Sequence, residues 1–581
     1  MVLLAALLGA TTRGGATPLS ATTGQPDTAR ATQAMVVAAE PSAAQAGLEI
    51  LRQGGNAVDA AVAVAFALAV THPAAGNLGG GGFMLIRMGD GSAAMVDYRE
   101  TAPAAARADM YLDAEGNLAP GATTEGWRAA GVPGTVAGME LALRSYGTMS
   151  LNQVLAPAIR LAEKGFPVSQ RLAASLRKAA DRLRRNPESR RLFLRNGRYY
   201  QAGDCLVQKD LARTLKRIAK KGARDFYQGS LARRFVRESK KAGGLFTLDD
   251  LRRYRALLRQ PLRGRFRGYE IITVAPPSSG GVALIETLNM LEPLLGPEDK
   301  PANPETIHVV TEALRRAFAD RARYLADPDF VPVPVTGLTD KRYAAAFSTT
   351  INRQRASISA QLKRPDPLRF QDDVPATATS SPPPQESDNT THFSVMDAAG
   401  NAVANTYTIN ELYGSGITVP GLGFLLSNTM DDFTIQPGAP NALFGLVQSE
   451  GNQIAPGKRP LSSMTPTIVT REGESILALG SRGGPRIISA ITEVLLHRLF
   501  FGHDLGLAVA RPRFHHQWLP DTLYVEEGVY TEAQLEALRA RGHDLAFRKV
   551  VGRVNAIERD PGSGQLYGVA DARAGGVARG Y

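Results

Sequence analysis

A short hairpin in the C-terminal half places the strongest constraint on the fold of this chain. In residues 390–397 (TTHFSVMD), apolar and polar side chains alternate, as expected of a half-buried strand. Residues 398–400 (AAG) are followed by a second strand-like stretch, residues 401–409 (NAVANTYTI). A three-residue loop with Gly in third place favours a type I turn closed by a left-handed residue. The sequence therefore predicts a tight antiparallel hairpin.

The loop length also fixes which residues face each other. If Asp397 faces Asn401, the numbers of paired residues sum to 798, so Thr390 lies opposite Thr408 on the same face. Two hydroxyl groups would then lie side by side where the first strand begins. Such a pair can serve packing alone, so a catalytic reading needs support from other residues.

The segment before the hairpin has the opposite character. Residues 375–385 (PATATSSPPPQ) lack apolar periodicity and are typical of a flexible linker, which we expect to run from about residue 354 to residue 389. A mobile segment that stops at a rigid strand is common at a domain boundary. It is also what self-cleavage of the chain would require.

The remaining pattern predicts one layered α/β unit. Helices are expected over residues 42–52, 57–70, 304–325 and 485–501 and through most of 135–255, and strands over 83–88, 93–98 and 269–275. Ser42 and Gln45 are spaced as a capping box. Asp59 interrupts an otherwise apolar helix and is expected to be buried and hydrogen-bonded. A helix-rich first part and a strand-rich second part favour sheets covered by helices.

Charge and cysteine content narrow the class. The chain has 67 Lys and Arg against 55 Asp and Glu, a net charge of +12, with an arginine cluster in residues 171–198 that includes Arg184 and Arg191. The cluster fits a solvated helical face, although it could also bind an anionic partner. No nucleic-acid motif accompanies it. The single cysteine, Cys205, excludes an internal disulfide and is expected to be a passive thiol.

The N-terminus resembles an export signal. Residues 1–12 (MVLLAALLGATT) are apolar but too short to span a bilayer, and no Lys or Arg precedes them. We expect residues 1–30 to be an export signal or a disordered N-terminus. The predicted location is periplasmic or secreted, with the cytoplasm as the alternative, and no stable membrane span is expected.

Polar clusters on predicted turns point to chemistry. They comprise residues 428–432 (NTMDD), 459–464 (RPLSSM) and 480–486 (GSRGGPR). The Gly483–Gly484 pair precedes a helix, where backbone N–H groups can point at an oxyanion or a phosphate. A phosphate loop would end in GK[ST], and a nucleophile elbow would read GxSxG; neither occurs. Oxyanion binding is therefore the better interpretation.

These motifs resemble one family in sequence and in order. Motifs in the C-terminal half resemble the small-subunit motifs of γ-glutamyltransferases (γ-glutamyl transpeptidases): NTTHFSVMD, TYTINELYGSGI, SNTMDDF, GKRPLSSMTPTIV, GSRGGPRII and PRFHHQWLPD. Motifs in the N-terminal half resemble the same family: GGNAVDAAVA, NLGGGGFM, DYRETAP, GVPGTVAG and APPSSGG. The resemblance covers the chain beyond residue 30. It implies an αββα N-terminal-nucleophile hydrolase fold, with two stacked antiparallel sheets between helical layers, made as one precursor.

The resemblance also implies self-cleavage between Asn389 and Thr390. The products would be a large subunit (residues 31–389) and a small catalytic subunit (residues 390–581), which form a heterodimer. Thr390 would be the nucleophile and its freed α-amine the base. Thr408 would orient the nucleophile, and the N–H groups of Gly483 and Gly484 would hold the oxyanion.

Substrate contacts follow from the same motifs. Arg99 would bind the α-carboxylate, because a planar guanidinium can donate two parallel hydrogen bonds to a carboxylate. Ser462 and Ser463 would assist in binding this group. Asn410 and Asp432 would bind the α-ammonium. The implied substrates are γ-glutamyl compounds such as glutathione, with water or an amine as acyl acceptor.

Two further positions bear on specificity. Phe444 falls where relatives with a lid loop carry an aromatic residue over the pocket. At Thr429, many relatives have Gln or Glu as a further ammonium ligand, so an acylase of glutaryl-type preference stays open as an alternative. An unprocessed, non-catalytic homologue that binds anions through residues 171–198 is a second alternative. The mechanism needs no metal or cofactor, and His515 and His516, without a third ligand in the sequence, are expected to be structural.

Overall fold

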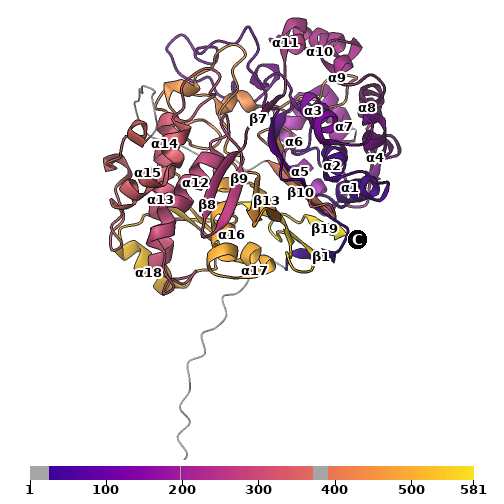
Figure 1. Cartoon of the computed structure of the whole chain (residues 1–581). Coiled ribbons are helices and arrows are strands. Elements are labelled where there is room, and N and C mark those ends of the chain that lie inside the picture. Colours follow the sequence, from indigo (N-terminus) through magenta and orange to yellow (C-terminus); the bar gives the residue numbers. More distant parts are fainter. Residues whose placement is uncertain (1–24, 196–197, 371–389) are drawn as a thin grey trace, which may run out of the picture.

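Two seven-stranded antiparallel sheets form the centre of the molecule. The computed structural model describes residues 25–195, 198–370 and 390–581. Sheet I has the order β19-β2-β10-β11-β3-β4-β7 and sheet II the order β1-β18-β17-β13-β12-β9-β8. The two sheets stack face to face, with β10 and β11 packed on β13. Helices cover both outer faces (Figure 1). The αββα expectation is confirmed.

The strands are short and come from the whole described chain. Sheet I comprises β2 (Ala34–Ala38), β3 (Gly81–Arg87), β4 (Ala93–Asp97), β7 (Leu257–Arg259), β10 (Thr391–Asp397), β11 (Ala402–Thr408) and β19 (Val577–Gly580). Sheet II comprises β1 (Asp27–Ala31), β8 (Leu262–Phe266), β9 (Tyr269–Thr273), β12 (Thr467–Arg471), β13 (Glu474–Arg482), β17 (Arg553–Arg559) and β18 (Leu566–Ala570). Two small sheets pair β5 (Phe166–Pro167) with β6 (Cys205–Leu206), and β14 (Phe514–His515) and β16 (Leu545–Arg548) with β15 (Leu523–Glu526).

The first helical layer lies on sheet I. It is built from α1 (Pro41–Arg52), α2 (Ala57–Thr71), α3 (Thr135–Tyr146), α4 (Leu151–Lys164), α5 (Gln170–Lys178), α6 (Ala180–Arg185), α7 (Pro187–Phe193), α8 (Lys209–Lys221), α9 (Ala223–Tyr227), α10 (Ser230–Lys241) and α11 (Leu248–Arg253). Every residue of α2 is buried, because the helix lies between β10 and β11 on one side and α1, α3 and α4 on the other. Burial on all sides explains its apolar composition.

The second layer covers sheet II. It includes α12 (Gly280–Leu294), α13 (Pro304–Tyr324), α14 (Val335–Thr339), α15 (Lys341–Ser348) and α16 (Arg486–Leu495), which continues as a π-helix (Leu496–Phe500). α16 packs on β13 and β17, and α12 packs on β8. α17 (Leu505–Ala510) and α18 (Glu532–Ala540) complete the described helices.

The two predictions about the first helices have different outcomes. Asp59 is buried, as expected, and accepts hydrogen bonds from the N–H groups of Asn56 and Thr148 at 2.8 and 2.9 Å. The predicted capping box of Ser42 and Gln45 is wrong. The first helix begins at Pro41, and the carboxylate of Glu40 accepts from the Ser42 N–H. Proline, which has no N–H to cap, is well suited to the first helical position, so the helix begins one residue before Ser42.

The predicted hairpin register is confirmed. Thr391 pairs with Tyr407 and Met396 with Ala402, so paired numbers sum to 798. Gly400 has φ of +80°, as the predicted loop requires. β10 and β11 lie in the middle of sheet I. The start of β10 and the end of β11 therefore lie side by side, at the same end of these two central strands.

Both predicted boundaries of the flexible segments need correction. Residues 27–31 form β1, which pairs with β18, so the N-terminal boundary at residue 30 falls inside a strand. The linker was expected to begin near residue 354, but residues 354–370 are folded against α13. Residues 1–24 and 371–389, on which the other parts of these predictions fall, lie outside the described residues.

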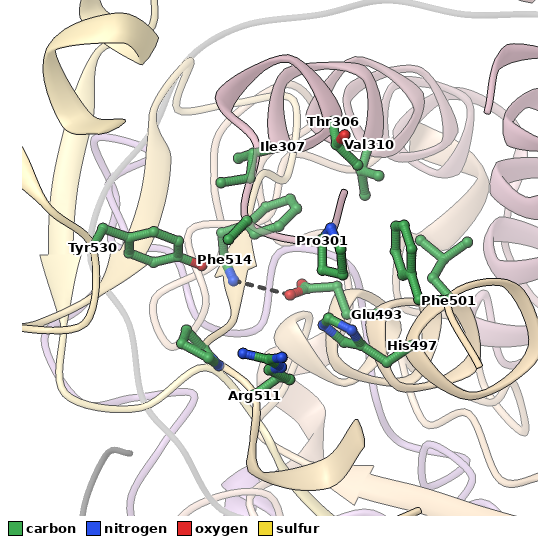
Figure 2. A pocket seen from close by; sticks show the side chains of 13 residues that line it. Pro301, Thr306, Ile307, Val310, Glu493, His497, Phe501, Arg511, Phe514 and Tyr530 are labelled. Atoms are coloured by element: carbon green, nitrogen blue, oxygen red, sulfur yellow. Dashed lines mark hydrogen bonds between the residues drawn. The ribbon is translucent and has the colours of Figure 1, made fainter. Parts of the chain in front are cut away.

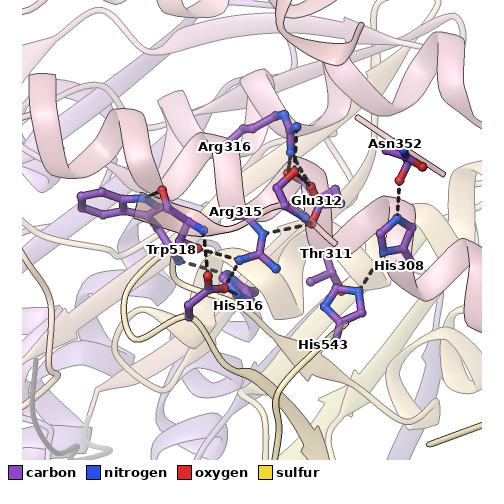
Figure 3. Close-up of polar contacts among 12 residues, drawn as sticks. His308, Thr311, Glu312, Arg315, Arg316, Asn352, His516, Trp518 and His543 are labelled. Carbon is purple, nitrogen blue, oxygen red and sulfur yellow. Dashed lines mark hydrogen bonds and ion pairs between the residues drawn. The ribbon is translucent and has the colours of Figure 1, made fainter. Parts of the chain in front are cut away.

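Buried charges on α13 explain why residues 354–370 are held in place. The Arg315 guanidinium donates to the Ser359 hydroxyl at 2.6 Å, and that of Arg316 donates to Ser357 at 3.2 Å. Nearby, His308 lies between the His543 ring and the Asn352 carbonyl, at 2.8 Å from each (Figure 3). A buried guanidinium needs acceptors, and this segment supplies some of them.

Candidate active site

Thr390 and Thr408 line one cavity where β10 begins and β11 ends. They are only 5 % and 3 % exposed. The Thr408 hydroxyl accepts from the N–H of Asn410 at 2.8 Å, and its carbonyl accepts from the Asn77 amide at 3.0 Å. These bonds fix the Thr408 hydroxyl in position beside the cavity.

Arg99 and Asp432 form a buried ion pair in the wall of the cavity. Arg99 follows β4, is 1 % exposed and donates from Nη2 to the Asp432 carboxylate. Its Nε donates to the Pro460 carbonyl at 3.2 Å. Two residues that are 333 positions apart in the chain thus meet in the wall of one cavity.

Asn410 connects this ion pair to the threonine site. Its backbone is left-handed, with φ of +74°. Its Nδ2 donates to the Asp432 carboxylate and to the Asn428 carbonyl, both at 3.2 Å. Because Nδ2 makes these bonds, the amide oxygen is what Asn410 retains for a ligand. Burial raises the pKa of Asp432, while Arg99 opposes that rise.

Ser462 and Ser463 also line the cavity. The Ser279 N–H and hydroxyl both donate to the Ser462 carbonyl, at 2.8 and 2.6 Å. The neighbouring Ser278 hydroxyl donates to the Met464 carbonyl at 2.6 Å. Ser278 and Ser279 therefore hold the backbone of the site.

Arg321 is a cavity residue that the sequence analysis missed. It lies on α13, is 2 % exposed, and donates to the hydroxyls of Ser279 at 3.0 Å and Ser463 at 3.3 Å. Burial lowers the pKa of its guanidinium to about 10. Arg321 lies seven positions after Leu314 on a largely apolar helical face. A charge at such a position was the signal that could have revealed it.

The turn of Gly483 and Gly484 connects β13 to α16. Gly484 lines the cavity, and its φ of +57° is in the left-handed region. A Cβ at this position would lie 2.5 Å from the Phe444 ring, so only glycine fits. α16 begins two residues later, and the positive end of its dipole points back towards the turn. This is a suitable place to stabilise an oxyanion.

The other end of α16 borders a second cavity, whose lining includes Glu493, His497 and Phe514 (Figure 2). The buried Glu493 carboxylate accepts from the Phe514 N–H at 3.2 Å, while its Oε1 has no partner among the described residues. Burial raises the pKa of Glu493 well above its usual range.

Phe444 lies over the cavity on a loop closed by its own hydrogen bonds. The Asn441 side-chain oxygen accepts from the N–H groups of Phe444 and Leu446, at 3.3 and 3.0 Å. The Gln517 amide donates to the Phe444 carbonyl at 3.1 Å. The ring is 5 % exposed and lines the cavity, where a lid residue is expected.

Thr429 lies behind the wall of the cavity. It is fully buried, is not among the cavity-lining residues, and donates to the Glu100 carboxylate at 3.2 Å. Burial raises the pKa of Glu100 to about 7, and its Oε2, which lies 3.8 Å from Arg99, accepts no hydrogen bond in the described part of the chain. Glu100 is a second buried group near the site to which the sequence analysis gave no role.

Other residues singled out in the sequence lie elsewhere. Arg184 pairs with Asp181 and Arg191 with Glu188 on the exposed faces of α6 and α7. The ring of His515 bonds to Ser489 and Gln517, and that of His516 to Asp521; both rings are buried. Cys205 is exposed.

Among the described residues, no group of three or more His, Cys, Asp or Glu side chains is placed to hold a metal ion. None of the described helices is long and apolar enough to cross a bilayer.

The fold and site define a class of protein. Two stacked antiparallel sheets between helical layers, with a threonine at the start of a central strand and a glycine turn beside it, are the arrangement of an N-terminal-nucleophile hydrolase. A family model described as gamma-glutamyltranspeptidase matches residues 43–581. The chain belongs to this family.

Similar proteins agree with that assignment. The glutathione hydrolase proenzyme of Escherichia coli (strain K12) is 44 % identical over 94 % of this chain and 91 % of its own. An acylase ACY 1 proenzyme from Pseudomonas sp. (strain SE83) is 38 % identical over 94 % of each. The crystal structure of a cephalosporin acylase from Bacillus halodurans superposes with a TM-score of 0.84 and 27 % identity, covering 98 % of this chain and 99 % of that one.

Proposed function

We propose that the protein cuts itself between Asn389 and Thr390 and then cleaves γ-glutamyl amides such as glutathione, passing the γ-glutamyl group to water or to an amine. One observation carries this proposal. A single cavity is lined by two threonines, an Arg–Asp ion pair and Gly484 of the turn before α16. Residues proposed as nucleophile, substrate anchors and oxyanion donor thus line the same cavity.

Self-cleavage would begin with Thr390. Its hydroxyl attacks the carbonyl carbon of Asn389, the C–N bond breaks, and the peptide becomes an ester with a free α-amine. Water then hydrolyses the ester and releases the new C-terminus. Before this step the nitrogen of Thr390 is an amide without basicity; afterwards it can accept the proton of the Thr390 hydroxyl.

The mature enzyme would use this amine for catalysis. Thr390 Oγ, deprotonated by its own amine and oriented by Thr408, attacks the γ-carbonyl of the substrate. The N–H groups of Gly483 and Gly484 stabilise the tetrahedral oxyanion. The protonated amine returns its proton to the leaving nitrogen, and an acyl-enzyme remains. Water or an amine then attacks the ester carbonyl and restores the Thr390 hydroxyl.

The buried ion pair matches the charges of the γ-glutamyl group. The α-carbon of that group carries one carboxylate and one ammonium. Arg99 suits the carboxylate, and Asp432 with the amide oxygen of Asn410 suits the ammonium. The bound zwitterion would replace one ion pair with two, so neither buried charge loses its partner. Ser462 and Ser463 line the same part of the cavity.

A glutaryl-type acylase is a second candidate, favoured by one observation. Thr429 bonds to Glu100 and does not line the cavity, so it gives no direct help to an ammonium. A glutaryl group lacks that ammonium but keeps the carboxylate. Comparing kcat/KM on γ-glutamyl and glutaryl anilides separates the two candidates.

Electrophoresis under denaturing conditions and N-terminal sequencing test the main proposal. Cleavage at the proposed bond gives a small fragment of 192 residues that starts at Thr390, and turnover of a γ-glutamyl anilide accompanies it. Thr390→Ala should stay intact and inactive. Thr391→Ala is the matched control, since Thr391 is adjacent and buried but does not line the cavity, and it should still be cleaved. An intact, fully active wild-type chain would refute the proposal.

Export is a separate prediction. The apolar residues 1–12 support a periplasmic or secreted location. Cell fractionation of the native host, with activity measured in each fraction, tests it.

A further inference from the structure

A large cavity lies apart from the proposed active site, between the first helical layer and the ends of β13 and β17. Its volume is about 600 Å³, within the range of small-molecule sites. The β2–α1 connection, the C-terminal end of α2, the start of α5 and Arg482 form its walls. No described residue lines both this cavity and the one at Thr390.

The walls of this cavity are strongly basic. Its cationic lining residues are Arg171, Lys178, Arg482, Arg553 and Arg573, of which Arg573 is paired with Glu526 and Asp571. Among the described lining residues, the only carboxyl group is that of Glu40. Burial lowers the pKa of Arg482 well below its usual range, and Arg553 and Arg171 lower it further, whereas Asp571 acts in the opposite direction. Like charges are thus held close together, which a bound anion would relieve.

Two polar groups in the wall have no partner among the described residues. One is Nε2 of His72, a side chain that is only 9 % exposed. The other is Nε of Arg482, whose Nη2 makes one long bond of 3.4 Å to the Ala574 carbonyl. Buried polar atoms are usually hydrogen-bonded, so these atoms indicate a ligand.

Two helices add to the positive potential. α1 and α5 both begin at the cavity, where Glu40 and Ser169 are their N-caps and line the wall. A helix N-terminus carries partial positive charge and favours anions. Burial raises the pKa of Glu40 to about 7, so near neutral pH its opposing negative charge is only partly present.

We propose that this cavity binds a small organic anion that carries two or more carboxylate or phosphate groups. More than one anionic group suits the site because its cations come from different elements: Arg171 and Lys178 from α5, and Arg482 from the end of β13. Leu172 and Leu412 provide apolar surface for the body of the molecule. A guanidinium can donate two parallel hydrogen bonds to a carboxylate or to a phosphate group.

Isothermal titration calorimetry with citrate and with inorganic pyrophosphate tests this site. We expect saturable one-to-one binding of at least one of the two anions to the wild-type enzyme at low ionic strength. The double variant Arg171→Gln/Lys178→Gln should bind at least tenfold more weakly. Arg177→Gln is the matched control, because this exposed residue is on the same helix but does not line the cavity; its affinity should stay within twofold of wild type.

A further variant separates this cavity from the active site. An anion held by Arg99 would lose affinity in Arg99→Gln, whereas one held in the basic cavity would not. Unfolding temperatures measured without ligand check that each variant is folded. Absence of saturable binding of both anions, equal weakening in Arg177→Gln, or loss of binding in Arg99→Gln would overturn the proposal.

Discussion

Replacing Asp432 by Asn removes one charge from the proposed substrate site and keeps the shape of the side chain. Asp432 is 8 % exposed, pairs with Arg99 and accepts from Asn410 at 3.2 Å. In the proposed complex it also binds the substrate ammonium. A hydrogen bond to a charged group contributes about 1.5–3 kcal/mol. The variant should therefore lose about 10- to 150-fold in kcat/KM on a γ-glutamyl anilide.

The matched glutaryl anilide isolates this effect, because it differs only by lacking the ammonium. Its kcat/KM should fall much less in Asp432→Asn, so the γ-glutamyl to glutaryl ratio should drop at least tenfold. Asp431→Asn is the control: Asp431 is buried, accepts from Thr123 at 2.6 Å and does not line the cavity, so it should affect both substrates alike. An unchanged ratio in Asp432→Asn would refute the assigned role.

The same variant should be less stable. Removing one partner of a buried ion pair costs about 3–5 kcal/mol, because the other charge is left uncompensated. Arg99 is 1 % exposed, and Glu100, 3.8 Å away, can compensate only part of its charge. We therefore expect the free energy of unfolding to fall by about 3 kcal/mol, the lower end of that range. A Tm equal to that of the wild type would contradict this estimate.

Three further predictions follow from individual contacts. Thr429→Gln should raise the γ-glutamyl to glutaryl ratio of kcat/KM about fivefold, because a longer amide side chain can reach the substrate ammonium. The magnitude corresponds to about 1 kcal/mol, which is typical of one hydrogen bond. An unchanged ratio would show that residue 429 does not determine specificity. Gly484→Ala should lower both Tm and kcat, since its Cβ would lie 2.5 Å from the Phe444 ring at a φ of +57°; unaltered values of both would show that the turn adapts. Glu493→Gln concerns stability against pH. Because its pKa is raised, Glu493 contributes fully to stability below the unfolded pKa of about 4.5, and this contribution is lost as pH rises towards the folded pKa. The Tm of the variant relative to wild type should therefore increase from pH 5 to pH 8. A constant Tm difference would contradict the raised pKa of Glu493.

Much of the site could be predicted where the constraint is local. The register of β10 and β11 followed from a three-residue loop, because pairing across a short turn leaves few alternatives. The family motifs then named residues such as Arg99 and Asp432, which the structure brings to one cavity. By contrast, local spacing misled at Ser42, where Pro41 begins the helix. Capping patterns are short and occur often by chance.

The sequence by itself determined the layered architecture, the central hairpin and the threonine pair, since alternation of apolar residues and turn length act over a few positions. Only the tertiary structure decided what surrounds them. Arg321 meets Ser463, 142 positions away, because α13 packs beside the site, and Thr429 faces Glu100 and not the cavity. The basic cavity around Arg482 likewise exists only where three strands and three helices converge. Burial and the distances between charges set these properties, and both depend on contacts between segments that are far apart in the chain.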